Sequence, residues 1–401
     1  MDIVNKKFHQ IFYLSVLLAL TLMLVGQSVE IMAQDSTLPE VTILRTPENG
    51  IQPQAVKDSV GTIHLIFYKG EAEAGDIFYV RLTSDGKPLT TPIRVNSQPN
   101  SAIAKGWVRG AQIAIGKNNR VHIIWNGSGK AAPKVPNGGP PMLYTRLNDT
   151  GTAFEPQRNL ITWAGGIDGG GALAADNIGN VYVFWHANVG AGGDAERTVF
   201  KTRSINDGKT FSREEKVNLK STGVCSCCAM KAFIDNNGIL YLLYRAAGDN
   251  INRDTTLLIS RDKAKTFESS TLARWKLEAC PLSVYSITQG DPSAPVIGAW
   301  VNQDQVYFAK LSTDHQLLSP HIFPSGTGNS RKYPVITADN KGNILFAWLE
   351  GAIWGKGGSL VWQVFDKTGS PLKEKGRVDG VPVWSLLTAF SSIDGRFVLI
   401  Y

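Results

Sequence analysis

Cysteine, methionine and histidine are scarce in this chain of 401 residues, which has four, five and six of them respectively. Four cysteines are too few to build a disulfide scaffold of this size, so a hydrophobic core must hold the fold together. Long apolar runs are missing after the N-terminal segment, which excludes a polytopic helical membrane protein. An apolar share of 43% excludes a disordered or collagen-like chain.

Runs of lysine and arginine are missing as well, although the net charge is +7. Because no basic run or basic helix exists, we expect no nucleic-acid partner. A mildly basic surface is compatible with an acidic partner, such as an anionic glycan or another small anionic ligand.

The N-terminus has the features of a secretory signal. Lys6 and Lys7 precede an apolar stretch over residues 11–25, and the small residue Ala33 follows a more polar segment. This pattern predicts a signal peptide over 1–33 and one domain over 34–401, secreted or periplasmic. The alternative is an uncleaved single anchor that would leave the domain attached to a membrane. Both place the folded part outside the cytoplasm.

A repeat organises the remaining sequence. Short apolar segments that end in an aromatic residue recur 48 to 60 residues apart. Their last residues are Phe67, Trp125, Trp185, Tyr244, Trp300, Trp348 and Tyr401. This period, without helical periodicity, predicts an all-β propeller with one four-stranded antiparallel blade per repeat. In the third repeat we expect strands at 172–175, 181–185, 198–204 and 215–219.

The predicted number of blades is seven, with six as the alternative. The last repeat is short, and residues 41–44 near the N-terminus could supply its outer strand. Such a closure joins both ends of the chain in one blade and removes free strand edges.

Two turns in register with the repeat share a motif. The first contains Ser204, Asn206, Gly208 and Phe211, and the second contains Ser260, Asp262 and Phe267. Both resemble the Asp-box, or BNR repeat, of sialidase-like β-propellers, and a third, partial copy occupies 147–154. The resemblance implies a sialidase-like fold and a structural role for these turns, away from the active face.

The catalytic residues of true sialidases are not evident. The resemblance implies an arginine near the start of the first inner strand, and Ile51 stands there instead. An exo-sialidase activity is therefore not expected, and if the chain is an enzyme we expect another glycoside hydrolase.

One face of the predicted propeller gathers polar and aromatic loop residues, because the loops between blades and those after the second strands meet there. The candidate catalytic residues are Arg245, His186, Asp254 and Glu350. The candidate substrate-binding residues are Arg253, Trp107, Arg109, Trp163, Asp168 and Trp354. Tryptophan stacks on sugar rings while polar groups meet hydroxyls and carboxylates, so a carbohydrate ligand is expected.

Each of these candidates has a structural alternative. Arg245 could bind a carboxylate bidentately, or it could form an ion pair with Asp254. His186 could be an acid, a base or a ligand, or only a hydrogen-bonded loop residue. Glu350 and Asp168 could form a carboxylate pair, but sequence does not determine their separation.

All four cysteines precede inner strands of adjacent predicted blades. They are Cys225, Cys227, Cys228 and Cys280, and the repeat predicts that their sulfurs are neighbours. The C-x-C-C stretch is similar to that of secreted sialidase-like proteins. Disulfides, a Cu or Zn site with Met230 or His186 as an extra ligand, and a redox-active Cys225–Cys228 pair all remain open. No cofactor is otherwise required.

Three functions follow from these features. The leading one is a secreted, monomeric propeller that recognises a glycan and could hydrolyse it. The others are a non-catalytic binding or scaffold propeller, and a periplasmic metal or redox protein that uses the cysteines.

Overall fold

The computed structural model describes residues 39–401 apart from 137, 189–191, 218–221, 313–316, 318, 327 and 329. Pro39–Tyr401 form one compact unit, and the predicted signal peptide lies outside the described residues. Nearly all regular secondary structure in this part is β-strand. The described residues include no helix with the length and apolar character needed to cross a membrane.

Seven sheets follow one another along the chain, and the first strand of each contacts the first strand of the next. These inner strands are β2 (Ile51–Lys57), β6 (Gln112–Ile115), β10 (Ala172–Ala175), β14 (Lys231–Ile234), β18 (Ser286–Thr288), β21 (Arg331–Ala338) and β25 (Thr388–Ser391). Because β25 also contacts β2, the ring is closed. The predicted β-propeller is confirmed, with seven blades rather than six.

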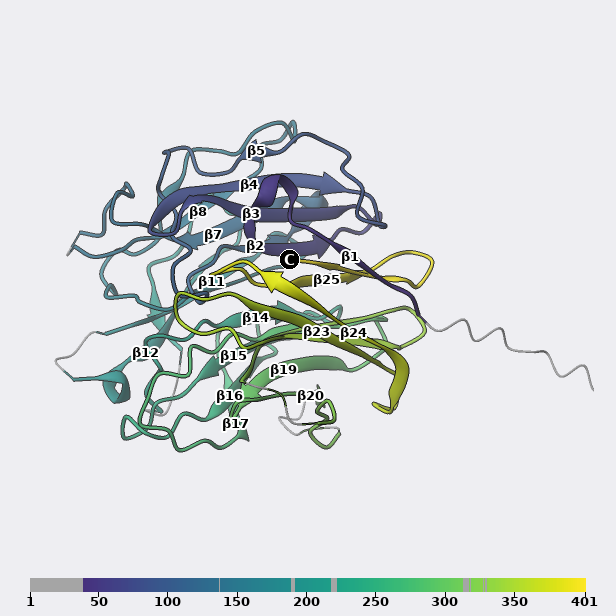
Figure 1. Cartoon of the computed structure of the whole chain (residues 1–401). Helices are drawn as coiled ribbons and strands as arrows, with labels where there is room; N and C mark the ends of the chain where they lie inside the picture. Colours follow the sequence, from purple (N-terminus) through teal and green to yellow (C-terminus); the bar gives the residue numbers. More distant parts are fainter. Residues whose placement is uncertain are drawn as a thin grey trace, which may run out of the picture. The chain divides into compact units, whose positions relative to one another are not determined.

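Within the first six blades the strands pair antiparallel in chain order, and Figure 1 shows these sheets. Five blades have four strands, whereas the described residues of the fifth blade supply three. The outer strands of blades one to three are β3 (Ile63–Glu71), β4 (Ala74–Leu82), β5 (Ile93–Arg94), β7 (Val121–Asn126), β8 (Met142–Arg146), β9 (Arg158–Asn159), β11 (Val181–Ala187), β12 (Thr198–Ser204) and β13 (Glu215–Lys216). Those of blades four to six are β15 (Leu240–Arg245), β16 (Thr255–Ser260), β17 (Glu268–Ala273), β19 (Val296–Asn302), β20 (Gln305–Leu311), β22 (Ile344–Glu350), β23 (Gly358–Phe365) and β24 (Pro371–Val381).

The seventh blade joins the two ends of the unit. It contains β25, β26 (Phe397–Ile400) and β1 (Val41–Leu44), and β1 pairs with β26 in parallel. Figure 1 shows β1 near the C-terminus of the chain. The predicted outer strand at 41–44 is thus present, and it covers an edge of β26 that would otherwise be open.

The second strand of each blade is largely buried on both faces, because it lies between the two neighbouring blades. Every residue of β7 and β15 is buried. The aromatic residues Trp125, Trp185 and Trp300 are at most 1% exposed. Trp300 packs in one cluster with Tyr241 of the preceding blade, so the repeated aromatic fills the seam between blades.

The turn between β12 and β13 is held by side chains of the first predicted motif. Ser204 Oγ accepts a hydrogen bond from the backbone N–H of Gly208 at 2.9 Å. Asn206 Oδ1 accepts one from the N–H of Thr210, also at 2.9 Å. The Phe211 ring packs against the Tyr144 ring of β8 at 4.8 Å, and this contact fixes the turn on the preceding blade.

The turn between β16 and β17 repeats this arrangement. Ser260 Oγ accepts a hydrogen bond from the N–H of Ala264 at 2.9 Å, and Asp262 Oδ1 accepts one from that of Thr266 at 2.9 Å. Ala264 has the left-handed φ of 62° at the position where the first turn has glycine. Asparagine and aspartate therefore serve the same turn, and both turns are structural.

The closing strand can be tested with Ile43, whose side chain packs on the cluster that contains Leu399. The change Ile43→Ala removes buried apolar surface, and we expect it to lower the free energy of unfolding by about 1–3 kcal/mol. Val60→Ala is the matched control, because Val60 is 76% exposed. Denaturant unfolding measures both variants. Equal stabilities of the two variants would contradict the role of β1 in closure.

Candidate functional site

The inner strands all begin at one face of the propeller, which we call the mouth face. Five residues at or just before these strands adopt left-handed φ angles between 51° and 63°. They are Gln52, Trp107, Leu282, Tyr333 and Trp384. Such angles are strained for bulky residues, and strained residues gather at ligand sites. The mouth face is therefore the candidate ligand-binding face.

An aromatic cluster fills the centre of this face. The rings of Trp107 and Trp384 are 4.5 Å apart, and those of Trp107 and Tyr333 are 5.2 Å apart. Trp107 is 1% exposed although it precedes blade two and its partners belong to blades six and seven. Trp354, whose ring is 4.8 Å from that of Trp384, is 57% exposed. Trp354 is therefore the tryptophan of this cluster that can stack on a ligand.

Arg109 and Asp168 form an ion pair beside this cluster. The Arg109 guanidinium also donates hydrogen bonds to the carbonyl oxygens of Asp168, at 2.9 Å, and of Lys105, at 2.8 Å. A Cβ at Gly106 would lie 2.9 Å from the Arg109 guanidinium and 3.4 Å from the Trp354 ring. The ion pair and the exposed indole thus adjoin, as the sequence analysis expected of a binding face.

A pocket of about 440 Å³ opens next to the ion pair, between blades two and three. Its polar lining consists of Arg109, Asp168, Asn126, Ser128 and Lys134, and the apolar lining includes two isoleucines and a proline. The Asn126 side chain donates to the carbonyl of Gly169 at 3.0 Å, and its Oδ1 has no partner among the described residues. The pocket therefore offers two cations and a carboxylate, while the Oδ1 of Asn126 is buried in its wall.

Arg245 does not face this pocket. Its side chain is fully buried, and it donates to the carbonyl oxygens of Arg253 at 2.7 Å and of Val301 at 2.6 Å. The predicted alternative, an ion pair with Asp254, is not formed, because the Asp254 carboxylate accepts a hydrogen bond from a backbone N–H instead. Arg245 ends β15 between two blades, so the structure leaves it no open surface.

His186 is also buried, at the end of β11. Its Nδ1 lies 3.2 Å from the guanidinium of Arg197, and its Nε2 has no partner among the described residues. Burial, and to a smaller extent the Arg197 charge, lowers the pKa of His186 to about 3. The imidazole is therefore neutral at physiological pH.

The carboxylates of the mouth face bind arginines. Glu350 accepts hydrogen bonds from Arg331 at 3.1 Å and Arg377 at 2.9 Å. Asp168 pairs with Arg109, so the predicted Glu350–Asp168 pair is not formed. Asp168 precedes blade three and pairs with Arg109, whereas Glu350 belongs to blade six and pairs with Arg331 and Arg377.

Arg253 and Trp163 lie outside the pocket lining. Arg253 is 2.6 Å from Asp194. Burial raises the pKa of Asp194, but the hydrogen bond from Arg253 and a second from Ser226 outweigh this effect and lower it overall. Trp163 is half-buried, and its ring packs edge-on against Phe200.

The four cysteines are neighbours, as the repeat predicts. Cys227 and Cys280 form a disulfide, and Cys225 and Cys228 are buried free thiols. The Cys225 Sγ lies 2.7 Å from the Cys228 Sγ and 3.5 Å from the Cys227 Sγ. With two sulfurs in a disulfide, the remaining thiols are fewer than the four ligands of a structural zinc site.

The two free thiols differ in acidity. The hydrogen bond with Cys228 and burial raise the pKa of the Cys225 thiol. Burial also opposes ionisation of Cys228, but the Cys225 thiol, the nearby Arg245 charge and the N–H of Ser283 lower its pKa overall. Cys228 is therefore the more acidic thiol of the pair.

Two polar residues of the pocket, Asn126 and Lys134, and one residue of a central cavity, Lys231, were not predicted as site residues. Asn126 follows the repeated aromatic directly, as His186 and Arg245 do, and that register was a usable signal. Lys134 sits in a long loop without a pattern. Lys231 begins the inner strand β14 and points into a cavity on the propeller axis. A charged residue on an inner strand was the signal that could have identified it.

Comparison with known proteins supports the fold. No family model and no curated protein matches the chain. The structure is similar to a protein of unknown function from Dyadobacter fermentans, with a TM-score of 0.55 and 14% identity, covering 82% of this chain and 97% of that one. An α-L-arabinanase from Penicillium chrysogenum complexed with arabinobiose gives a TM-score of 0.54 and 12% identity, covering 83% and 99%.

A sialidase is also similar. The Hadza microbial sialidase Hz136 gives a TM-score of 0.51 and 12% identity, covering 80% of this chain and 69% of that one. The sialidase-like propeller fold expected from the turn motifs is confirmed. At these identities the likeness concerns the fold alone.

The disulfide gives a prediction about stability. The double change of Cys227 and Cys280 to alanine opens a loop of 53 residues, and we expect it to lower the free energy of unfolding by about 2–4 kcal/mol. Denaturant unfolding with and without dithiothreitol measures this effect. The matched control, Cys225→Ala with Cys228→Ala, should keep the sensitivity to the reductant, which the first variant should lose. Equal sensitivity of both would contradict the pairing.

Proposed function

We propose that this chain is a carbohydrate-binding propeller that acts outside the cytoplasm and binds its ligand at the mouth face. The observation that carries the proposal is the exposed Trp354 beside the Arg109–Asp168 ion pair and the pocket of about 440 Å³. An exposed indole provides a flat apolar surface for the face of a sugar ring. The charged groups in the pocket can bind its hydroxyl groups through directed hydrogen bonds.

Binding is better supported than hydrolysis. Most glycoside hydrolases use two carboxyl groups, one protonated to act as the acid. On the mouth face, Asp168, Asp194 and Glu350 each pair with an arginine rather than with a second carboxyl group. The buried aromatic cluster around Trp107 also fills the centre of this face, so a ligand would bind beside the propeller axis.

The comparisons support a carbohydrate as the ligand class. The similar arabinanase was solved in complex with arabinobiose, and the other named neighbour with a stated activity is a sialidase. The signal-like N-terminal segment and the Cys227–Cys280 disulfide support a location in an oxidising compartment.

The proposal predicts which side chains control affinity. A glycan array of neutral and acidic oligosaccharides, probed with the full chain, identifies the ligand, and calorimetry measures its affinity. We expect Trp354→Ala to weaken binding roughly five- to tenfold through the loss of stacking. Asp168→Asn should weaken it roughly tenfold by removing a charged acceptor.

The matched control is Ile353→Ala, because Ile353 is adjacent to Trp354 and equally exposed at 57%. Its affinity should equal that of the unchanged chain. Binding that Trp354→Ala and Asp168→Asn leave intact would place the ligand elsewhere. Release of shortened sugars from the bound glycan would overturn the non-catalytic assignment.

The cysteine cluster favours a second candidate function, thiol–disulfide exchange. The buried Arg245 has no carboxylate partner among the described residues, and its charge favours ionisation of the Cys228 thiol. In the first step Cys225 passes its proton to Cys228, and its sulfur attacks Cys227 so that Cys280 leaves as a thiolate. Cys280 then takes a proton from water.

In the second step the Cys228 thiol loses its proton to water and its sulfur attacks Cys225. The Cys225–Cys228 bond forms and Cys227 leaves as a thiolate. Two electrons thus move from the buried pair to Cys227 and Cys280, without an external oxidant. Cys280 is exposed, so this relay would present reactive thiols at the surface.

Disulfide mapping tests the relay. After equilibration at pH 8, acid quenching and alkylation, mass spectrometry should find both the Cys227–Cys280 and the Cys225–Cys228 linkages. The variant Cys225→Ser cannot begin the exchange and should contain the first linkage alone. If the unchanged chain also contains that linkage alone, no exchange occurs.

A further inference from the structure

A second cavity runs along the axis of the propeller, enclosed by the seven inner strands, with a volume of about 730 Å³. This volume lies in the range of small-molecule sites. At the end opposite the mouth face, the cavity reaches the turns between first and second strands, where Asn119, Asn177 and Asn236 line it. It is separate from the pocket beside Arg109, since the two share no lining residue.

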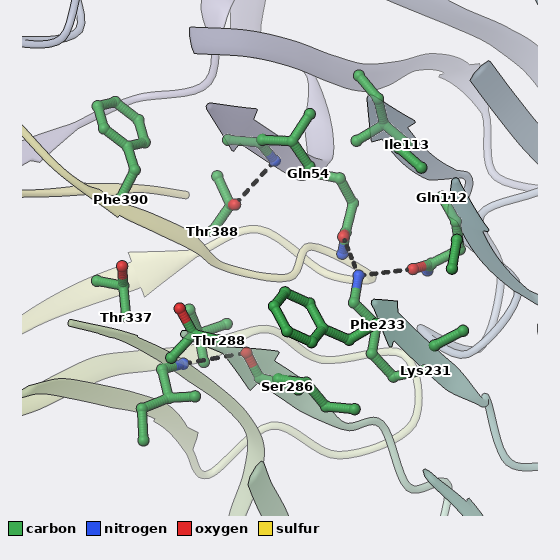
Figure 2. Close-up of a pocket in the computed structure, with 18 of the residues that line it drawn as sticks. Gln54, Gln112, Ile113, Lys231, Phe233, Ser286, Thr288, Thr337, Thr388 and Phe390 are labelled. Carbon is green, nitrogen blue, oxygen red and sulfur yellow. Dashed lines mark hydrogen bonds between the residues drawn. The ribbon is translucent and has the colours of Figure 1, made fainter. Parts of the chain in front are cut away.

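One lysine of the inner ring projects into this cavity. Lys231 Nζ donates hydrogen bonds to the side-chain oxygens of Gln112, at 2.9 Å, and of Gln54, at 3.2 Å (Figure 2). Burial lowers the pKa of Lys231 to about 8. Two neutral amides replace part of its hydration, but neither carries a compensating negative charge.

The acidic groups around the cavity leave this charge unbalanced. Among the described lining residues the ionisable side chains are Lys57, Asp58, Lys231, Tyr285 and Tyr333. Asp58 is bound to His64 at 3.1 Å and to two backbone N–H groups. Burial raises the pKa of both tyrosines, so they stay neutral. The cavity is therefore positive at Lys231.

The lysine also orients its neighbours as donors. Because the ammonium holds the Oε1 atoms of Gln54 and Gln112, their NH₂ groups must point elsewhere, and these have no partner among the described residues. The hydroxyl-bearing side chains of Thr288 and Thr337 lie across the cavity in Figure 2. Donors around one cation recognise an anion.

Apolar side chains form part of the walls. Ile113, Phe233 and Phe390 line the same cavity, and Figure 2 shows Ile113 near Gln112 and Phe233 near Lys231. One ammonium balances one negative charge, and apolar walls suit an organic body better than a strongly hydrated phosphate.

We propose that the central cavity binds a small monocarboxylate with an apolar body, whose carboxylate contacts Lys231 and the amide NH₂ groups of Gln54 and Gln112. This site differs in place and ligand from the carbohydrate site of the mouth face. The proposal stands or falls independently of that site.

Calorimetry with the full chain tests the site with benzoate, with acetate and glucuronate as smaller and more polar carboxylates. Benzamide is the neutral analogue, and inorganic phosphate probes the alternative anion. We expect benzoate to bind at least tenfold more tightly than benzamide and phosphate. The affinity should be constant below about pH 8 and fall roughly tenfold per pH unit above it, since Lys231 then loses its charge.

Lys231→Met keeps the length of the side chain and removes its charge, and should weaken benzoate binding at least tenfold. The matched control is Lys57→Met, which removes the second lysine of the same cavity and should change the affinity less than twofold. Thermal unfolding checks that both variants are folded. Absence of binding by all three carboxylates, equal affinity of Lys231→Met, or preference for phosphate would each overturn the proposal.

Discussion

Burial of the second strand of every blade between its two neighbours is the interaction on which the rest of this structure depends. No single blade can cover both faces of such a strand, so Trp185 or Trp300 becomes buried only when the adjacent blade is in place. The requirement extends around the ring, which must close to protect its last seam. Parallel pairing of β1 with β26 provides that closure and brings both ends of the unit into one blade.

The same burial decides what polar residues can do when they follow the repeated aromatic. Asn126, His186 and Arg245 occupy this register in three successive blades. Arg245 is fully buried and donates hydrogen bonds to backbone carbonyl groups. His186 is buried in the neutral state. Asn126 is buried as well, at 2% exposed, and only borders the pocket beside Arg109. The exposed polar groups of this face therefore come from loops rather than from the repeated strands.

Two cationic side chains inside this molecule, Arg245 and Lys231, differ in their surroundings. Arg245 lies near the Cys228 thiol, whose pKa it lowers, and its guanidinium is 5.2 Å from the centre of the Trp275 ring. Lys231 has only amide oxygens, which stabilise an ammonium less than a carboxylate does. A folded chain that keeps an unbalanced charge in a cavity retains a site of high electrostatic potential, and this is why the cavity is suited to an anion.

The architecture and the cysteine neighbourhood could be predicted from the sequence, because both follow from periodic burial. An aromatic residue every 48 to 60 residues indicates blades, and cysteines before adjacent inner strands lie close together. It also indicated Arg109, Asp168 and Trp354 as parts of one face. The hydrogen-bond partners of Arg245 and Glu350, and the position of Lys231 in the cavity, depend on the tertiary structure. These partners come from loops and strands far apart in the chain, and charge pairing depends on distances of a few ångströms that no local pattern encodes.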